Sequence, residues 1–305
     1  LPKLEKLPGC AGIKIFMGSS TGTLLVSEEE DLEKALKACK RRVALHSEDE
    51  TRLKKRFLEI NKKKGVSQHE VWRDKESAIL STKRILKYAK KYNTQAHILH
   101  ISTKDEIELL KNTKNNITAE VTPQHLTLYS PNCYKLLGSK AQMNPPIRNN
   151  KHRNGLWKGI YNNTVSVIGS DHAPHTIKEK KLKWPNSPSG LPGVQTTLHL
   201  MLYHINKKKI SLEKVIELLC YNPAKIYNIK NKGQLKKGFD ADIVIIDFNK
   251  NYTIKNQDMA YKCGWTPFHN LKIKGDIYAT LVNGRVKMIE KKVLGKPDGK
   301  MVQFK

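Results

Sequence analysis

The chain reads TVSVIGSDHAPH at residues 164–175, and this segment decides which fold the sequence predicts. Residues 164–169 form an apolar run typical of a buried strand, and Asp171 and His175 follow it closely. Pro174 stops the strand and fixes the chain so that both ionisable side chains can face one pocket. A polar turn capped by Asp171 is the simpler alternative, but packing alone explains an acid and a histidine at this place poorly.

Apolar segments and amphipathic helices alternate from the start of the chain to about residue 228. We expect strands at residues 12–17, 43–46, 96–101, 117–121 and 164–169, and helices at 27–39, 76–92, 104–110, 194–204 and 211–220. Ser27 and Glu30 form a capping-box pattern at the start of the first of these helices. Strands that alternate with helices indicate parallel βαβ units, which fit either an open doubly wound sheet or part of a (β/α)8 barrel.

Polar residues on four of the predicted strands favour the barrel. Lys14 lies within its strand, whereas His46, His100 and Asp171 lie at or near strand ends. A TIM barrel builds its active site where the carboxyl ends of its strands meet, so that these side chains could converge there. The predicted fold class is therefore α/β, with a TIM barrel as the main domain.

The sequence changes character after about residue 231. Strands and turns replace the helices, and Asn283-Gly284 between alternating residues is a strong signal for a hairpin turn. We expect two domains, with a barrel at residues 1–230 and a small C-terminal β-sandwich portion at residues 231–305.

The formal net charge of +28 comes from lysines that are dispersed along the whole chain. Aromatic residues make up only 7% and do not interleave with the basic runs, so we expect no nucleic-acid partner. No apolar stretch approaches the roughly 20 residues of a membrane span, and we expect no membrane partner. The five cysteines form no C-x-x-C pair, which favours reduced thiols and a cytoplasmic location.

Two histidines and one lysine on the predicted strands suggest metal chemistry. Imidazole is a preferred nitrogen ligand of zinc, and His46 and His100 both belong to apolar strands. Each could instead be a hydrogen-bonded core histidine. Lys14 between two isoleucines would be costly to bury unless it is paired or neutral, and a desolvated lysine can act as a nucleophilic amine. A lysine that extends its ammonium to solvent is the alternative.

With these residues in view, the chain resembles the amidohydrolase superfamily and, within it, the dihydroorotase family. Three phrases carry the resemblance to dihydroorotases, namely KIFMGSSTG at 14–22, QMNPPIR at 142–148 and GSDHAPH at 169–175. Three more support the wider superfamily, namely SGLPGVQ at 189–195, NPAK at 222–225 and GFDAD at 238–242.

The resemblance implies an activity and a set of roles. The activity is the reversible, zinc-dependent interconversion of dihydroorotate and N-carbamoyl-L-aspartate in pyrimidine biosynthesis. Lys14 would be carbamylated and would bridge two Zn²⁺ ions, and His46 and His100 would bind the second ion. Asp171 would bind the first ion and act as the catalytic acid and base. Asn144 and His175 would contact the small-molecule substrate, His175 at its carboxylate.

The chain also departs from the family pattern. The family begins its barrel with His-x-His on the first strand, and this sequence contains no such pair. In that pattern Lys14 belongs to strand four, so we expect a barrel without strands one to three. Such a chain alone should fold poorly or be inactive, because an open barrel leaves exposed strand edges. Another cyclic amidohydrolase, such as a hydantoinase or allantoinase, and a non-catalytic truncated relic stay as alternatives, and a homo-oligomer is left open.

Overall fold

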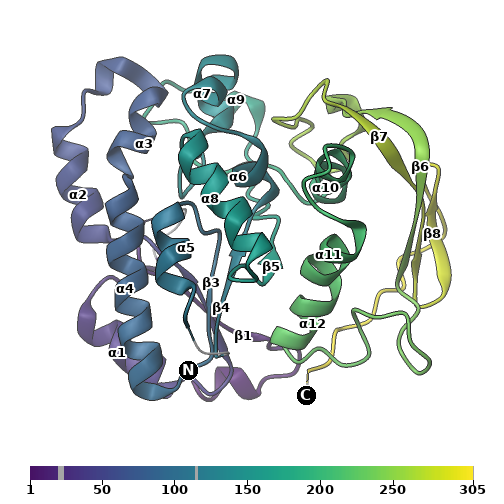
Figure 1. The fold of residues 1–305 in the computed structure, drawn as a ribbon, viewed down its shortest axis with the longest axis horizontal. Coiled ribbons are helices and arrows are strands. Elements are labelled where there is room, and N and C mark those ends of the chain that lie inside the picture. Colours follow the sequence, from purple (N-terminus) through teal and green to yellow (C-terminus); the bar gives the residue numbers. More distant parts are fainter. Residues whose placement is uncertain (20–23, 114–115, 305) are drawn as a thin grey trace. The chain divides into compact units, whose positions relative to one another are not determined.

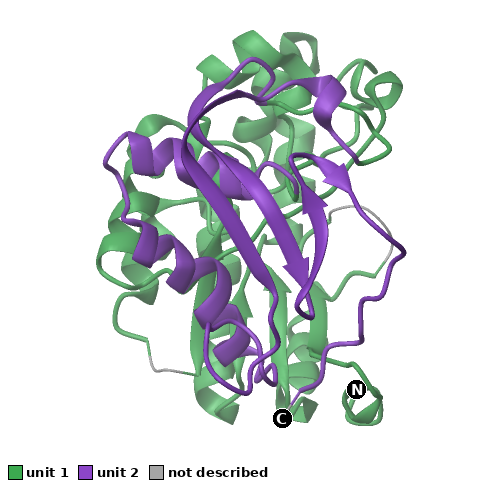
Figure 2. Ribbon diagram, turned by 90° about the vertical axis from the view of Figure 1, so that its right-hand side faces the viewer, with its two compact units in different colours: residues 1–194, 261–267 green, residues 195–260, 268–305 purple. Residues whose placement is uncertain are grey.

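The computed structural model describes residues 1–19, 24–113 and 116–304. Residues 20–22 of the phrase at 14–22 therefore lie outside the described residues. The chain divides into two compact units, which Figure 2 colours green and purple. Unit 1 comprises Leu1–Val194 and Tyr261–Pro267, and unit 2 comprises Gln195–Ala260 and Phe268–Lys305.

Unit 1 alternates strands with helices, as Figure 1 shows. Its elements in chain order are η1 (Leu4–Lys6), β1 (Gly12–Phe16), α1 (Glu29–Ala38), β2 (Arg42–His46), α2 (Glu50–Glu59), η2 (Lys62–Gln68), α3 (His69–Trp72), α4 (Lys75–Tyr92), β3 (Ala96–Ile98), α5 (Lys104–Leu110), β4 (Ile117–Val121), α6 (Pro123–Thr127), α7 (Asn132–Leu137), η3 (Gly138–Ala141), α8 (Asn150–Tyr161), β5 (Val167–Ile168) and α9 (Ile177–Lys180).

The five strands of unit 1 form one parallel sheet in the order β1-β2-β3-β4-β5. Neighbours in the sheet are neighbours in the chain, and helices connect them, which is the arrangement of consecutive barrel units. Figure 1 shows α4, α5 and α8 side by side along these strands. The buried core includes Ile15, Leu45, Ile98 and Val121, one from each of the first four strands. The predicted barrel portion is confirmed.

Several helix boundaries follow from capping. Asp74 accepts a hydrogen bond from the Ser77 amide at the start of α4, and Thr103 and Glu106 form a capping box at the start of α5. The capping box predicted at Ser27 is wrong. The helix begins at Glu29, and the Ser27 hydroxyl donates to the Glu28 carboxylate instead of accepting from a helical amide.

Other differences from the sequence prediction concern the strand ends. Strand β3 ends at Ile98 and β5 spans only Val167–Ile168, so His100 lies after its strand rather than inside it.

The Lys14 side chain is exposed rather than buried. The next residue of the same strand, Ile15, is buried, because successive side chains of a strand face opposite sides of the sheet.

Unit 2 consists of a helical part and a four-stranded antiparallel sheet in the order β6-β7-β8-β9. The predicted turn at Asn283-Gly284 is confirmed, since it joins β7 to β8. The elements are α10 (Thr197–Asn206), α11 (Leu212–Ile216), the π-helical turn η4 (Glu217–Tyr221), α12 (Asn222–Ile226), β6 (Ile243–Thr253), η5 (Asn256–Asp258), β7 (Lys272–Val282), β8 (Arg285–Ile289) and β9 (Lys292–Val293).

Helix α10 packs on β7, and the His199 ring lies 3.1 Å from the Asp276 carboxylate. Contacts of this kind place α10 in the same compact unit as the sheet, so the units separate at residue 194. The domain boundary predicted at residue 230 stays a prediction.

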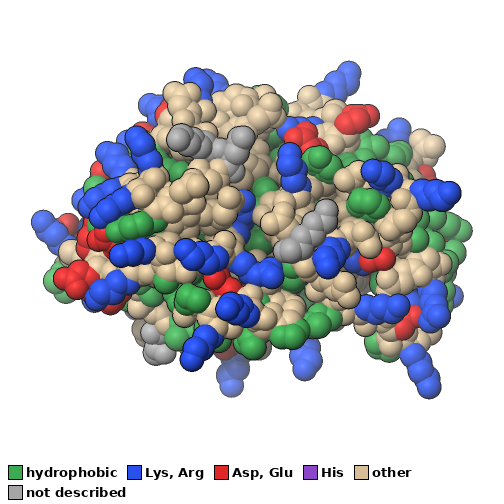
Figure 3. Space-filling view, turned by 90° about the horizontal axis from the view of Figure 1, so that it is seen from below, with side chains coloured by type: hydrophobic (Ala, Val, Ile, Leu, Met, Phe, Trp, Pro, Cys, Tyr) green, Lys and Arg blue, Asp and Glu red, His purple; other side chains and the backbone are tan. Residues whose placement is uncertain are grey.

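Surface lysines are dispersed over the molecule. On the face that Figure 3 shows, Lys and Arg side chains are scattered among other residues and do not form one stripe. None of the described helices has both the length and the apolar character of a membrane-spanning segment.

The contact between α5 and α8 leads to a test of the packing. A Cβ atom at Gly155 would lie 2.2 Å from the Lys104 Cβ atom, closer than real contacts allow. We expect Gly155→Ala to lower the free energy of unfolding by about 1–3 kcal/mol through overpacking. On an uncrowded helix the same change would raise it by up to about 1 kcal/mol. Urea titration measures the difference.

Gly299→Ala is the matched control, because no atom lies within 4 Å of a Cβ built there. Its effect should stay within about 0.5 kcal/mol. A Gly155→Ala protein as stable as the parent would contradict the close packing of α5 on α8.

Candidate active site

Two of the predicted ligands, His46 and His100, lie in direct contact. The Nδ1 atom of His46 and the Nε2 atom of His100 are 3.0 Å apart, and both rings are buried. His46 is the last residue of β2, and His100 follows β3, the neighbouring strand. Burial lowers the pKa of both imidazoles, that of His100 well below its usual value. Both rings are therefore neutral near pH 7.

Glu48 fixes the orientation of His46. Its carboxylate is fully buried and accepts the Nε2 proton of His46 at 3.2 Å. The same carboxylate pairs with Arg73, whose Nη2 atom lies 2.5 Å away. Burial alone would raise the pKa of Glu48, but Arg73 and His46 lower it to about 2. The carboxylate thus stays charged and holds His46 in the tautomer that leaves Nδ1 unprotonated.

The histidine pair has the donor chemistry of half a metal site. With Nε2 of His46 engaged by Glu48, the two ring nitrogens that converge carry lone pairs or share one proton, and a cation can bind both. Among residues 1–19, 24–113 and 116–304, no three His, Cys, Asp or Glu side chains are grouped so that they could hold a metal ion. The described histidines therefore fit a metal, but as a partial ligand set.

Lys14, Asp171 and Glu120 form the charged part of the candidate site. Burial, together with the negative charge of Glu120, raises the pKa of the Asp171 carboxyl to about 6, against the opposing effect of Lys14. Desolvation lowers the pKa of the Lys14 ammonium even though its side chain is partly in contact with solvent, and Asp171 and Glu120 act against this. The charges of Lys14 and Asp171 thus each oppose the effect of burial on the pKa of the other.

Glu120 is a site residue that the sequence analysis missed. It lies on β4, where its carboxylate is 3.2 Å from Nε2 of His97. A Cβ atom at position 169 would lie 2.6 Å from Oε2 of Glu120, so Gly169 leaves room for this carboxylate. The available signal was Glu120 itself, an acid within an otherwise uncharged strand that ends near the predicted site.

The backbone at His100 and Asp171 adopts an uncommon conformation. Their φ angles are +38° and +41°, in the left-handed region that residues other than glycine rarely occupy. Both residues lie just beyond the carboxyl ends of their strands. Strained backbone of this kind clusters at functional sites, where the surrounding structure holds it. The conformation also explains why neither residue continues its strand.

Asn144 is oriented by a buried histidine. The Nε2 atom of His69 lies 3.0 Å from the Oδ1 atom of Asn144 and 3.0 Å from the Met143 carbonyl oxygen. Burial lowers the pKa of His69 to about 3, so the neutral ring donates its Nε2 proton to these oxygens. The amide oxygen of Asn144 is thereby engaged, and its NH₂ group is the end that can donate to a ligand.

His175 is held by contacts on both its side chain and its backbone. Its Nε2 atom lies 3.0 Å from the Ser189 carbonyl oxygen, and its own carbonyl accepts a hydrogen bond from the Trp265 indole at 2.8 Å. The neighbouring His172 instead accepts a hydrogen bond from the Gly193 amide. Of the two histidines in the phrase at 169–175, His172 therefore supports the loop backbone.

Arg148, the last residue of the phrase at 142–148, is buried and joins three segments. Its guanidinium donates to the Ser102 hydroxyl and to the carbonyl oxygens of Arg73 and Asp74. The segment that carries Asn144 is thereby tied to the one that follows His100. The roles predicted for the six site residues stay predictions, and of the six only His46 and His100 share a hydrogen bond among the contacts of the described residues.

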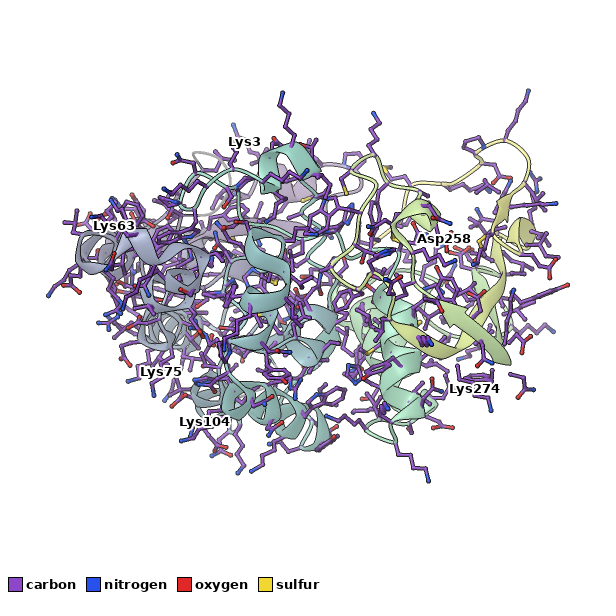
Figure 4. The ribbon with its side chains drawn as sticks, turned by 90° about the horizontal axis from the view of Figure 1, so that it is seen from above. Lys3, Lys63, Lys75, Lys104, Asp258 and Lys274 are labelled. Carbon is purple, nitrogen blue, oxygen red and sulfur yellow. The ribbon has the colours of Figure 1, made fainter. Side chains whose placement is uncertain are left out.

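A cavity of about 850 Å³ lies elsewhere in unit 1, lined by α4, α5 and α8. Lys75 and Lys104, the first residues of α4 and α5, are among its lining residues and are labelled in Figure 4. None of the six predicted site residues lines this cavity. We place the candidate site at the strand ends, because the buried histidines and the shifted carboxyl group are there.

Comparisons with known proteins identify the family of the chain. A protein named dihydroorotase from Pyrococcus furiosus is 36% identical over 291 residues, which cover 95% of this chain and 64% of that protein. A protein of the same name from Methanosarcina mazei is 34% identical, covering 100% of this chain and 70% of its own length. The chain thus spans about two thirds of the length of such relatives.

Among solved structures, an L-hydantoinase (dihydropyrimidinase) from Arthrobacter aurescens has the same fold, with a TM-score of 0.90. It is 24% identical, and the match covers 97% of this chain and 68% of that one. The model of the amidohydrolase family matches residues 11–287. The resemblance predicted from the sequence is confirmed, and the chain belongs to the amidohydrolase family.

Proposed function

We propose that this chain contributes most of the active site of a dihydroorotase, which reversibly hydrolyses the ring amide of dihydroorotate to N-carbamoyl-L-aspartate. The observation that carries the proposal is the buried pair of His46 and His100, whose facing ring nitrogens lie 3.0 Å apart, with Glu48 bonded to the other nitrogen of His46. Relatives that are 34–36% identical over nearly the whole chain and bear the name dihydroorotase support the choice of substrate.

The metal in this proposal is zinc, held by His46 and His100. Desolvation lowers the pKa of Lys14, which increases the share of neutral amine that reaction with carbon dioxide requires, and the carbamate together with Asp171 would complete the ligands from this chain. A bound zinc ion would supply Lewis-acid activation of a carbonyl group and of water near neutral pH. In its full form the proposal has two zinc ions, and carbamylated Lys14, His46, His100 and Asp171 are the residues of this chain that would hold them.

Asp171 moves the proton in the proposed reaction. A carboxyl group with a pKa of about 6 is suited to general acid and base catalysis near neutral pH. In the hydrolytic direction Asp171 takes a proton from the attacking water and delivers it to the departing ring nitrogen. In the synthetic direction the same carboxyl group carries the proton the other way.

Asn144 and His175 are proposed to bind the carboxylate end of the substrate. The Asn144 NH₂ group is free to donate because His69 engages its oxygen. The His175 ring donates its Nε2 proton to the Ser189 carbonyl oxygen, so Nδ1 would bind the carboxylate as the second donor of a doubly protonated, positively charged ring. A cytoplasmic location belongs to the same proposal, and all five cysteines of the chain are free thiols.

Zinc affinity tests the proposed metal site. We expect His100→Asn to weaken zinc binding at least roughly tenfold, because it removes one of two converging imidazole ligands. Titration of the apoprotein with zinc in competition with a chromophoric chelator gives the affinity. His269→Asn is the control, since His269 is an exposed histidine of unit 2. Equal zinc affinity in the parent and in both variants would contradict the site.

Ligand selectivity distinguishes a dihydroorotase from a hydantoinase. Dihydroorotate and dihydrouracil share the ring amide, but only dihydroorotate has a carboxylate for Asn144 and His175. We expect calorimetric titration of the zinc-loaded chain to show binding at least roughly tenfold tighter for dihydroorotate, the value of one charge-assisted hydrogen bond. Preference for dihydrouracil would favour a hydantoinase, and zinc binding without either ligand would favour a non-catalytic protein.

A further inference from the structure

Lys180, the last residue of α9, is a buried lysine outside the proposed chemistry, with only 2% of its surface exposed. Its ammonium group donates to three backbone carbonyl oxygens, those of Gln142 at 3.0 Å, Pro188 at 2.8 Å and Gly190 at 3.1 Å. Within the part of the chain that the structure describes, no carboxylate forms an ion pair with it. The three N–H donors of an ammonium are thus all used on backbone.

Burying an ammonium group without a carboxylate partner costs free energy of folding. We therefore expect Lys180 to have a role in the structure beyond filling space. A buried charge without an opposite charge loses its hydration, and burial lowers the pKa of Lys180 to about 7. A methionine or leucine would fill the same space without this cost. The ammonium supplies what an apolar side chain cannot, namely three directed hydrogen bonds to two separate segments.

The two segments are those that carry or hold the proposed substrate-binding residues. Gln142 lies two residues before Asn144. Pro188 and Gly190 flank Ser189, whose carbonyl oxygen accepts the Nε2 proton of His175. The Lys180 ammonium therefore holds the residues on both sides of Ser189, and the carbonyl oxygen of Ser189 orients the His175 ring.

Direct bonds between the segments complete the assembly. The Gly190 amide donates to the Gln142 carbonyl oxygen at 3.0 Å, and the Gln142 side chain donates to the Ser187 carbonyl oxygen at 2.9 Å. A Cβ atom at Gly190 would lie 2.5 Å from the Ala173 carbonyl oxygen, so the loop has little room to shift toward the His175 segment. Loss of one set of contacts would consequently displace the others.

We propose that Lys180 is a positioning residue that holds the Gln142–Asn144 segment and the Ser187–Gly190 loop together, so that Asn144 and His175 present their donors to one carboxylate. The part about the carboxylate rests on the proposed function. The part about the two segments does not.

The charge state of Lys180 gives the device a pH dependence. Below pH 7 the ammonium offers three donors, and above pH 7 the neutral amine offers two and turns a lone pair toward one carbonyl oxygen. Ligand affinity should therefore fall as the pH rises through about 7. Two other ionisable groups lie nearby. The Glu179 carboxylate accepts a hydrogen bond from the Thr176 amide, and the His175 ring donates to the Ser189 carbonyl oxygen.

Lys180→Met tests the inference, with Lys178→Met as the matched control. Both changes remove one lysine from α9, but Lys178 is exposed. Hydrogen–deuterium exchange of the Gly190 amide, which donates to the Gln142 carbonyl oxygen, should quicken at least roughly tenfold in Lys180→Met only. The dissociation constant for N-carbamoyl-L-aspartate, with zinc present, should be roughly tenfold higher in Lys180→Met than in the parent. In Lys180→Met this constant should also differ much less between pH 6 and pH 8 than it does in the parent.

Unchanged exchange of the Gly190 amide in Lys180→Met would overturn the inference whatever the ligand result. Faster exchange with unaltered ligand affinity would overturn the link to Asn144 and His175. If the parent chain binds no N-carbamoyl-L-aspartate, the proposed function fails, and the exchange comparison still decides whether Lys180 holds the two segments. Unaltered circular dichroism of both variants shows that each has folded.

Discussion

The buried Glu48 carboxylate is the group on which the candidate site depends. It meets His46 on one side and Arg73 on the other, and all three side chains are almost completely removed from solvent. Removing one partner of such a buried ion pair costs about 3–5 kcal/mol, because the other charge stays buried and unpaired. The pair therefore fixes the ring of His46, and through it the nitrogen that faces His100.

Buried cations play a second, related part in this molecule. Arg148 and Lys180 both direct their donors to backbone carbonyl oxygens rather than to carboxylates alone. Long segments with only short helices follow β4 and β5, and a parallel sheet cannot hold them by its own hydrogen bonds. A charged side chain with several donors can join segments that lie far apart in the sequence. This is how residues from separate loops reach fixed positions in unit 1.

The sequence predicted the regular elements well where local signals are strong. Helix α5 and strand β4 have the predicted bounds, since a Thr-x-x-Glu cap precedes the helix and apolar and polar residues alternate along the strand. The prediction failed where tertiary contacts decide the boundary. Strand β3 ends at Ile98 because the chain turns into a left-handed conformation at His100, and α8 was not anticipated within its long irregular stretch.

By itself, the sequence determined the residue types available for the site and their order along parallel strands. Parallel strands bring their carboxyl ends to one edge, so His46, His100 and Asp171 could be grouped in advance. Only the tertiary structure decided the contacts of Glu120 and Lys180, because these depend on which segments meet far along the chain. It also decided that Lys14 is exposed, since burial of a strand residue depends on its neighbours in space and not on the adjacent isoleucines.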